Sequence, residues 1–335
     1  MGTNKLKTLK KMYHEESLEK YSFLVTGGAG FIGSNIVAYL IEHHAKKIRI
    51  LDNLSTGFLK NIEPFLSLPN VEFIQESIVS TEVCMQACQG IDYVLHQAAL
   101  GSVPRSLINP IASNEANVTG FLNILWACKE RGVKRLVYAS SSSVYGDSPI
   151  LPKQENQIGK PLSPYALTKY INELYAEVFA KNYGMDCIGL RYFNVFGYNQ
   201  SPEGAYAAVI PLFINALMKK QAPAIHGDGE QSRDFTFVEN AVQANIRAAL
   251  SKHPQAGNKV YNIACGEQLS INEIFRIIKE IMEVEISPIY TTARKGDIRN
   301  SLADISAAKE FLGYQPTILA KEGLRKTIEW FMEER

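Results

Sequence analysis

The chain has 335 residues, a formal net charge of +1 at pH 7 and a hydrophobic fraction of 46 %, so it can bury a large core with a smaller domain beside it. The near-zero charge argues against nucleic acid as a partner, and no apolar run is long enough to span a bilayer or to form a signal-peptide core. The five cysteines are scattered, and Cys84 and Cys88 lack a second pair of ligands. We therefore expect buried thiols, no metal site and a cytoplasmic protein.

Residues 1–20 are polar, with weak apolar periodicity at Leu6, Leu9, Met12 and Leu18. This pattern predicts an N-terminal extension with a helix that lies against the first domain. The simplest interpretation of its basic residues is a solvated face.

The stretch from Phe23 to Leu40 predicts a strand, a tight glycine turn and a helix. An apolar run ends at Thr26, and helical periodicity begins at Ser34. Between them glycines recur every third residue, so that the backbone can turn tightly, approach a pyrophosphate and let the helix pack close to the strand. The helix N-terminus offers free N–H groups to phosphate. We expect a dinucleotide to contact Gly27, Gly30, Phe31, Ile32 and Gly33.

A second predicted strand, Ile48–Leu51, ends at Asp52 and Asn53. An acidic residue about 20 positions past the glycines can hold both ribose hydroxyls of an adenosine and would repel a 2′-phosphate. Asp52 therefore predicts NAD rather than NADP, although a residue of this type also suits a turn at a strand end.

Further strands are predicted over residues 71–74, 90–96 and 135–139, and a helix over residues 110–131 carries Asn117. Strands that alternate with helices predict an α/β fold, a Rossmann-type doubly wound parallel sheet. Ligands of such sheets lie beyond the strand carboxyl ends. The small residues of Gln97-Ala98-Ala99 follow one strand, where backbone can lie against a flat cofactor.

Four serines, Ser140–Ser143, follow the strand at 135–139 and taken alone indicate a polar turn. After a proline, Tyr165 and Lys169 stand four residues apart, which on a helix puts phenol and ammonium on one face. This spacing is also common on ordinary amphipathic helices. A lysine lowers the pKa of a nearby phenol, as a positive nicotinamide would, so Tyr165 can act as a general base on a sugar hydroxyl. A serine beside it can hold the same oxygen.

Together these motifs make the chain resemble the extended short-chain dehydrogenases/reductases, and within them the nucleotide-sugar 4-epimerases, from about Tyr21 to the C-terminus. It is similar to the branch of bacterial UDP-N-acetylglucosamine 4-epimerases that serve surface-polysaccharide (O-antigen) pathways. The resemblance also rests on the motifs Leu190-Arg191-Tyr192-Phe193-Asn194, Arg233-Asp234 and Arg294-Lys295-Gly296-Asp297.

The resemblance implies Ser141, Tyr165 and Lys169 as catalytic residues, and Asn117 and Lys169 among the contacts of a tightly bound NAD. It implies that Arg233 and Arg294 grip the diphosphate of a UDP-sugar, as a planar guanidinium fork can, although either could be a surface ion pair. Many relatives hold the adenine amine with an aspartate where this chain has Glu76-Ser77, so Ser77 is the expected substitute. The remaining implied substrate contacts are Ser102, Val103, Ser142, Ser143, Asn194, Val209, Asp297 and Ser301.

The two residues directly after Ser141 indicate the type of reaction. Similar 4,6-dehydratases place an Asp-Glu pair, and similar decarboxylases a glutamate, where this chain has Ser142-Ser143. An epimerase needs no such acid, because the 4-keto sugar turns over and takes the hydride back on its other face. A dehydratase, a decarboxylase or a catalytically silent nucleotide-sugar-binding module are the alternatives.

The small Ser301, and Ser102 where hexose-specific relatives carry a lysine, leave room for an N-acetyl group at carbon 2. UDP-glucose and uronic acid forms stay open, and Arg105 can tolerate a carboxylate. The resemblance also implies a homodimer through the helices that carry Asn117 and Tyr165. We expect residues 21–197 plus about 234–265 to bind NAD, and residues 198–233 and 266–335 to form a smaller α/β UDP-sugar domain.

Overall fold

The computed structural model describes residues 11–203, 207–293 and 299–333. Its larger lobe is built on a seven-stranded sheet in the order β11-β6-β5-β4-β1-β2-β3, with every neighbouring pair parallel. The strand order reverses between β1 and β4, and this switch point is where a doubly wound sheet binds its ligand. The strands are β1 (Ser22–Thr26), β2 (Lys47–Leu51), β3 (Val71–Ile74), β4 (Tyr93–His96), β5 (Arg135–Ser141), β6 (Cys187–Tyr192) and β11 (Lys259–Ile263).

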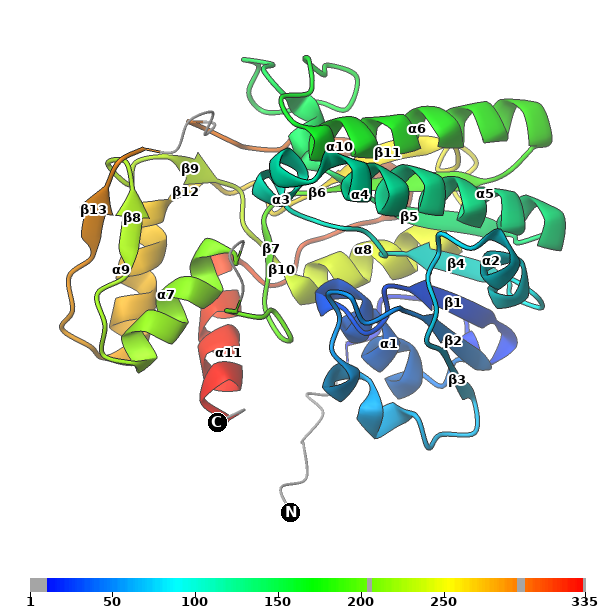
Figure 1. Ribbon diagram of the computed structural model, residues 1–335, viewed down its shortest axis with the longest axis horizontal. Coiled ribbons are helices and arrows are strands. Elements are labelled where there is room, and N and C mark those ends of the chain that lie inside the picture. The colour runs from blue at the N-terminus through cyan, green and yellow to red at the C-terminus, as the bar shows by residue number, and fades with distance from the viewer. Residues whose placement is uncertain (1–10, 204–206, 294–298, 334–335) are drawn as a thin grey trace.

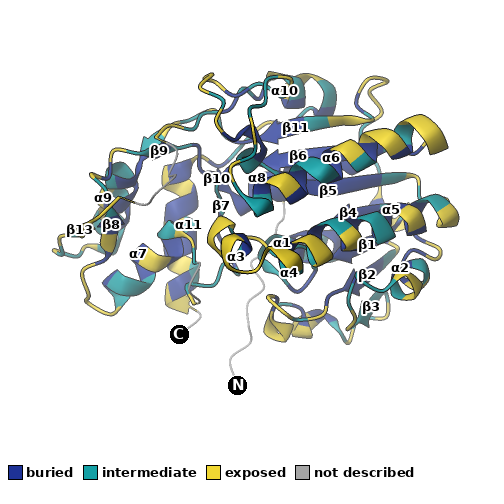
Figure 2. Cartoon of the chain, turned by 45° about the horizontal axis from the view of Figure 1, so that its top comes forward, coloured by how far each residue is buried: buried dark blue, intermediate teal, exposed yellow. Residues whose placement is uncertain are grey.

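Helices cover both faces of the sheet, as the alternating pattern predicts (Figure 1). One face packs against α1 (Phe31–Glu42), α8 (Val238–Leu250) and α10 (Ser306–Leu312), and the other against α2 (Thr81–Ala87), α5 (Gly120–Arg131) and α6 (Pro164–Tyr183). Helix α8 is buried almost throughout (Figure 2), because it lies between the sheet and α1. The predicted α/β fold is thus confirmed.

The helix predicted over residues 110–131 is interrupted. It begins as α4 (Pro110–Asn114), passes through a π-helical segment, η4 (Glu115–Thr119), and continues as α5. A shorter helix, α3 (Val103–Ile108), precedes it, and single 3₁₀ turns occur at η1 (Leu18–Lys20), η2 (Leu59–Asn61), η3 (Glu63–Phe65) and η5 (Ser142–Tyr145).

The smaller lobe has a core of its own, formed by α7 (Val209–Met218), α9 (Ile271–Met282) and α11 (Ala320–Glu333). Short strand pairs complete it: β8 (Ala224–His226) with β13 (Ile289–Thr291), and β9 (Ser232–Arg233) with β12 (Leu269–Ser270). A further pair, β7 (Val195–Phe196) with β10 (Thr236–Phe237), lies where the lobes meet (Figure 1). Helix α10 packs on β11 and α8 in the larger lobe, on the other side of the predicted domain boundary.

The described part of the N-terminal extension lies against α1, as expected. Tyr13 stacks on Tyr39 at a centroid distance of 5.3 Å, and its backbone N–H donates to the Tyr39 hydroxyl at 2.8 Å. Only the turn η1 is helical among residues 11–20, and the remainder of the extension falls outside the described residues. None of the described helices combines the length and apolar character needed to cross a membrane.

Candidate active site

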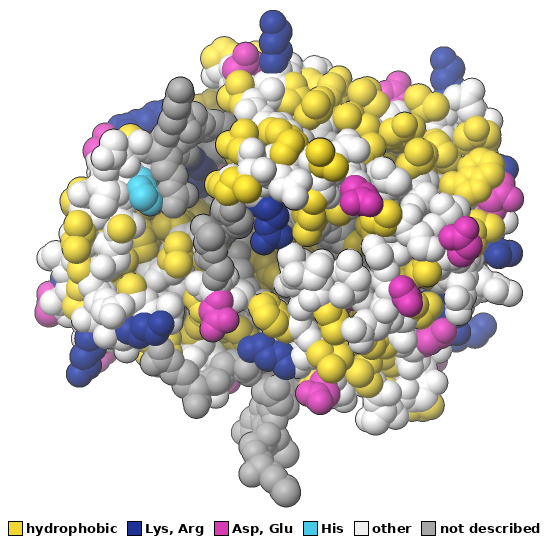
Figure 3. All heavy atoms as spheres, viewed as in Figure 1, with side chains coloured by type: hydrophobic (Ala, Val, Ile, Leu, Met, Phe, Trp, Pro, Cys, Tyr) yellow, Lys and Arg dark blue, Asp and Glu magenta, His cyan; other side chains and the backbone are white. Residues whose placement is uncertain are grey.

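A cavity of about 850 Å³ opens at the carboxyl ends of the sheet strands, and Figure 3 shows the molecule hollowed between the two lobes. The residues predicted to bind the cofactor and perform the chemistry converge there from segments far apart in the chain. Those that line it are Gly27, Gly30, Phe31, Ile32, Gly33, Asp52, Asn53, Ser77, Gln97, Ala98, Ala99, Ser102, Ser141, Tyr165, Lys169 and Asn194.

Two glycines of the glycine loop, Gly27 and Gly33, have no room for a side chain. A Cβ on Gly33 would lie 2.1 Å from the carbonyl oxygen of Gly27, and one on Gly27, whose φ is +66°, would lie 2.7 Å from the amide nitrogen of Ala98. Helix α1 starts directly after this loop with no side chain capping its first turn, so its N–H groups face the cavity end of the helix. The cradle fits the pyrophosphate of a dinucleotide.

Asp52 lies at the end of β2 and braces the loops on both sides of it. One carboxylate oxygen accepts the N–H of Ala29 at 2.9 Å and the other the N–H of Leu54 at 2.8 Å. The side chain is 8 % exposed and lines the cavity, so its remaining lone pairs can accept ribose hydroxyls. Ser77 lines the same end, and its hydroxyl accepts the N–H of Val79 at 3.2 Å.

Ser141, Tyr165 and Lys169 meet at the other end of the cavity. Burial raises the pKa of Tyr165, and a hydrogen bond with the Ser141 hydroxyl opposes this increase. The Lys169 ammonium donates to the carbonyl of Ala139 at 2.8 Å, and burial lowers its pKa to about 8. The expected lowering of the Tyr165 pKa is therefore corrected: in the protein alone, burial of the phenol raises this pKa.

A buried ion pair between Glu173 and Arg191 lies next to this end of the cavity. Glu173 accepts two hydrogen bonds from the Arg191 guanidinium, at 2.9 and 2.7 Å, and a third from the Ser140 hydroxyl at 2.5 Å. Glu173 stands one turn after Lys169 on α6 and opposes the fall in the lysine pKa. The pair thus ties α6, β5 and β6 together beneath the catalytic residues.

Gln97 is held in the cavity wall by two residues that sequence reasoning missed as functional. Its amide nitrogen donates to Asn245 at 2.9 Å, and its amide oxygen accepts the Tyr192 hydroxyl at 3.1 Å. Asn245 also donates to the Tyr192 hydroxyl at 2.6 Å. Tyr192 belongs to the sequence motif singled out above, but its partner on α8 is distant in sequence.

The predicted substrate contacts are only partly brought together. Val103, Ser142, Ser143, Val209, Arg233 and Ser301 do not line the cavity as described. Arg233 and Ser301 do lie close to each other, because the Ser301 N–H donates to the carbonyl of Ser232 at 3.1 Å. The Ser143 hydroxyl is buried without a hydrogen-bond partner among the described residues. Arg294 and Asp297 lie outside the described residues.

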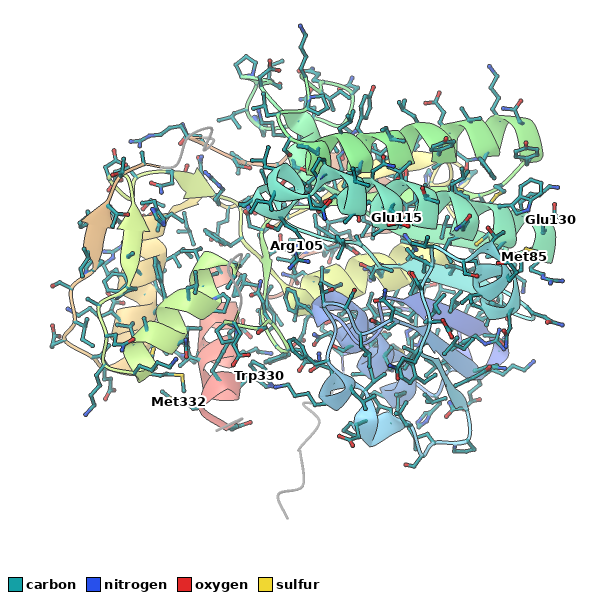
Figure 4. The ribbon with its side chains drawn as sticks, in the orientation of Figure 1. Met85, Arg105, Glu115, Glu130, Trp330 and Met332 are labelled. Carbon is teal, nitrogen blue, oxygen red and sulfur yellow. The ribbon has the colours of Figure 1, made fainter. Side chains whose placement is uncertain are left out.

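Arg105, which the sequence suggested as a partner for a sugar carboxylate, lines the cavity from α3 (Figure 4). Other lining residues were not predicted as site residues, among them Tyr192 and Glu203 of the loop after β7. Ile78 and Val79 also line the cavity. They follow β3, and because ligands of such sheets lie beyond the strand carboxyl ends, their position in the sequence could have predicted this.

Asn117 does not line the cavity. Its side chain lies 1 % exposed in η4, where its amide oxygen accepts the N–H of Leu100 at 2.7 Å and its nitrogen donates to the Thr168 hydroxyl at 3.1 Å. In this arrangement it shapes the cavity wall through Leu100 and α6, and its direct contact with a cofactor stays a prediction.

Comparison with known proteins gives consistent results. The model of the NAD dependent epimerase/dehydratase family matches residues 23–264. A UDP-N-acetylglucosamine 4-epimerase from Methanobrevibacter ruminantium, solved with UDP-N-acetylmuramic acid, is 41 % identical with a TM-score of 0.88, over 94 % of this chain and 99 % of that one.

Other relatives differ in the sugar. A UDP-glucose 4-epimerase from Mycolicibacterium smegmatis is 34 % identical over 92 % of this chain and 97 % of its own. A UDP-glucuronate 4-epimerase from Thermodesulfobacterium geofontis is 35 % identical over 93 % and 96 %. Matches also include a decarboxylase of a UDP-sugar acid and a dTDP-glucose 4,6-dehydratase.

Proposed function

The chain belongs to the NAD dependent epimerase/dehydratase family, and we propose that it interconverts UDP-N-acetylglucosamine and UDP-N-acetylgalactosamine. At the coarser level, UDP-sugar 4-epimerisation is the activity named for similar proteins that cover 92–94 % of the chain, and the family model is that of NAD dependent enzymes. The observation that carries the choice of epimerisation over dehydration is the pair Ser142 and Ser143 directly after Ser141, where no acid is available to eliminate water.

The glycine loop, Asp52, Gln97 and Lys169 would hold NAD, which when bound accepts the hydride from carbon 4 of the sugar and returns it. Tyr165 takes the proton of the 4-hydroxyl as general base, and Ser141, which lines the cavity with it, holds the same sugar oxygen. The Lys169 ammonium stays charged enough, with a pKa of about 8, to bind ribose hydroxyls. After the keto-sugar turns over, Tyr165 returns the proton.

The preference for an N-acetyl sugar rests on small side chains. Ser102 lines the cavity, and Ser301 lies beside Arg233 on the smaller lobe. Two such small side chains support a site with room for a substituent on carbon 2. The 41 % identity to a UDP-N-acetylglucosamine 4-epimerase supports the same choice of sugar. UDP-glucose and UDP-N-acetylhexosaminuronic acids are second candidates, since similar proteins act on glucose and glucuronate forms. A role in surface polysaccharide biosynthesis stays a prediction.

The test is incubation of the purified protein with UDP-N-acetylglucosamine without added NAD, followed by NMR of the anomeric signals. We expect UDP-N-acetylgalactosamine at unchanged mass, and faster conversion than with UDP-glucose or UDP-glucuronate in parallel. A product lighter by one water or one carbon dioxide contradicts epimerisation. Faster conversion of another sugar contradicts the substrate preference alone.

We also propose that two copies of the chain associate through α5 and α6. The outer face of α6 exposes Leu167, Leu174 and Val178 by 44–51 %, and Trp126 of α5 is 39 % exposed beside them. Figure 3 shows hydrophobic side chains gathered over these helices. A second copy, with the same apolar face, would cover them.

A further inference from the structure

The peptide of the catalytic tyrosine is fixed to the cavity wall by its own N–H group. Tyr165 is the second residue of α6, and helices leave the first N–H groups without an intrahelical partner. The N–H of Tyr165 donates to the Ser106 hydroxyl of α3 at 3.0 Å, and that hydroxyl donates in turn to the carbonyl of Val103 at 2.8 Å. Ser106 is completely buried.

The carbonyl of Tyr165 is fixed in the same way. It accepts the Thr168 hydroxyl at 2.8 Å, and this hydroxyl accepts the Asn117 amide at 3.1 Å. Asn117 also holds both backbone groups of Leu100, at 2.7 and 3.2 Å. Thr168 and Asn117 are 4 % and 1 % exposed, so water does not compete for these bonds.

Both chains of hydrogen bonds therefore start at the Tyr165 peptide and end on one short segment, Leu100–Ser106. This segment lines the cavity through Leu100, Ser102 and Arg105. Ser102 takes a φ of +100°, a conformation that a serine adopts only when its surroundings enforce it. The structure thus joins the wall that faces the sugar to the backbone of the catalytic base, in a buried and fully paired circuit.

We infer that Ser106 and Thr168 are positioning residues of the reaction: they hold the Tyr165 peptide against the Leu100–Ser106 segment, so that the phenol and a sugar in the cavity keep their reactive distance. The inference rests on the proposed function in that Tyr165 is the base, but it does not depend on which UDP-sugar is the substrate. Neither side chain lines the cavity, so each acts through Tyr165.

The test compares Ser106→Ala and Thr168→Val with Ser113→Ala as the matched control. Ser113 is a 1 % exposed serine of the adjacent α4 whose hydroxyl donates to a backbone carbonyl, that of Asn109, at 3.1 Å. We expect kcat to fall by about 10- to 100-fold in Ser106→Ala, since small displacements of reacting groups cost this much. KM should change by less than about threefold and NAD content should stay the same, because the cofactor and UDP contacts are untouched.

A second readout does not depend on turnover. Hydrogen–deuterium exchange of a peptide that spans Tyr165 should accelerate in Ser106→Ala and stay at the wild-type rate in Ser113→Ala, because only the former removes the partner of the Tyr165 N–H. A kcat in Ser106→Ala within twofold of the Ser113→Ala value, with unchanged exchange, overturns the inference. If the wild type converts UDP-glucose or UDP-glucuronate instead of UDP-N-acetylglucosamine, the proposed substrate fails and the same comparison is made on the converted sugar.

Discussion

Substitution of Tyr165 distinguishes the two hypotheses for this chain, an active epimerase and a catalytically silent nucleotide-sugar-binding protein. Tyr165 lines the cavity together with Ser141, whose hydroxyl opposes the rise of the Tyr165 pKa. Tyr165→Phe removes only the phenol hydroxyl, so we expect kcat to fall by about 10²- to 10⁴-fold, the usual contribution of a general base. NMR turnover assays measure the loss.

The matched control is Tyr170→Phe, on the same helix but outside the cavity lining. It should retain wild-type turnover. Full activity in Tyr165→Phe would remove the phenol from the mechanism and leave the serine turn to supply the base.

Gly33 tests the cofactor cradle. A methyl group there would lie 2.1 Å from the carbonyl oxygen of Gly27, which belongs to the backbone and cannot move aside as a flexible side chain would. We therefore expect Gly33→Ala to displace the glycine loop and to lower the NAD content of the purified protein by about tenfold or more, equivalent to about 1.4 kcal/mol or more of binding free energy. Release of NAD from denatured protein, quantified by chromatography, checks this. Stoichiometric NAD in the variant would show that the loop is not the pyrophosphate site.

Sequence reasoning located these residues because their signals are local. The glycine spacing and the Tyr165–Lys169 spacing each lie within one turn or loop, where chain geometry alone fixes the side chains. Tyr192 and Asn245 hold Gln97 from β6 and α8, and no local pattern could pair residues so distant in sequence. The pKa of Tyr165 was misjudged for a related reason, since its burial depends on elements from the whole chain.

At the scale of elements, long periodic segments were predicted and interruptions were not. The strands β2 and β3 occur within a residue of their predicted bounds, because apolar runs extend over whole elements. The helix at residues 110–131 breaks at η4, where Asn117 bonds to Leu100 and Thr168. That break depends on tertiary partners. The two-residue strands β7, β9, β10 and β12 are too short to have a period.

The contact between the N-terminal extension and α1 should weaken in acid. The Nδ1 atom of His14 and the Tyr39 hydroxyl form a hydrogen bond of 2.7 Å. Burial, together with the nearby His43, lowers the pKa of His14 to about 4. Because the folded pKa lies below the unfolded value of 6.5, the neutral form is favoured by folding. Its contribution to stability is present above about pH 6.5 and is lost as pH falls toward about 4.

His14 is half-buried, so we discount the contribution for solvent screening to about 1–2 kcal/mol. Urea unfolding at about pH 7.5 and at about pH 5 measures it. His14→Asn should reduce the difference between the two pH values, and His44→Asn, at a histidine of the α1–β2 turn, should leave it unchanged. An equal pH dependence in wild type and His14→Asn would assign acid sensitivity to other groups.

At the scale of the whole molecule, the chain passes several times between the two lobes. It leaves the larger lobe after β7, returns with β10 and α8, leaves again after β11 and returns once more with α10 before ending in α11. The expected domain division places a first departure after residue 197 and a return near residue 234. It contains no return at α10, because Ala308, Leu312 and Tyr314, which complete the core beside β11, belong to no motif.

The exposed face of α6 gives the prediction for assembly. Leu167, Leu174 and Val178 are spaced by seven and four residues, so they form one stripe along the helix. A stable dimer needs about 800 Å² buried per partner, which this stripe supplies only together with Trp126 and the neighbouring α5 surface. A charge in its centre would be desolvated without a partner.

We therefore expect the wild type to sediment at twice the chain mass and Leu174→Lys/Val178→Lys to sediment at the chain mass at micromolar concentration. Leu319→Lys is the control, since Leu319 is 47 % exposed against 44 % for Leu174 but lies in the segment before α11. It should leave the mass unchanged. Monomeric wild type would contradict association through α5 and α6, and a dimer that persists in the double variant would place the interface on another face. In that second case the apolar stripe would need a different partner, because a monomer gains nothing in stability from three large aliphatic side chains held in water.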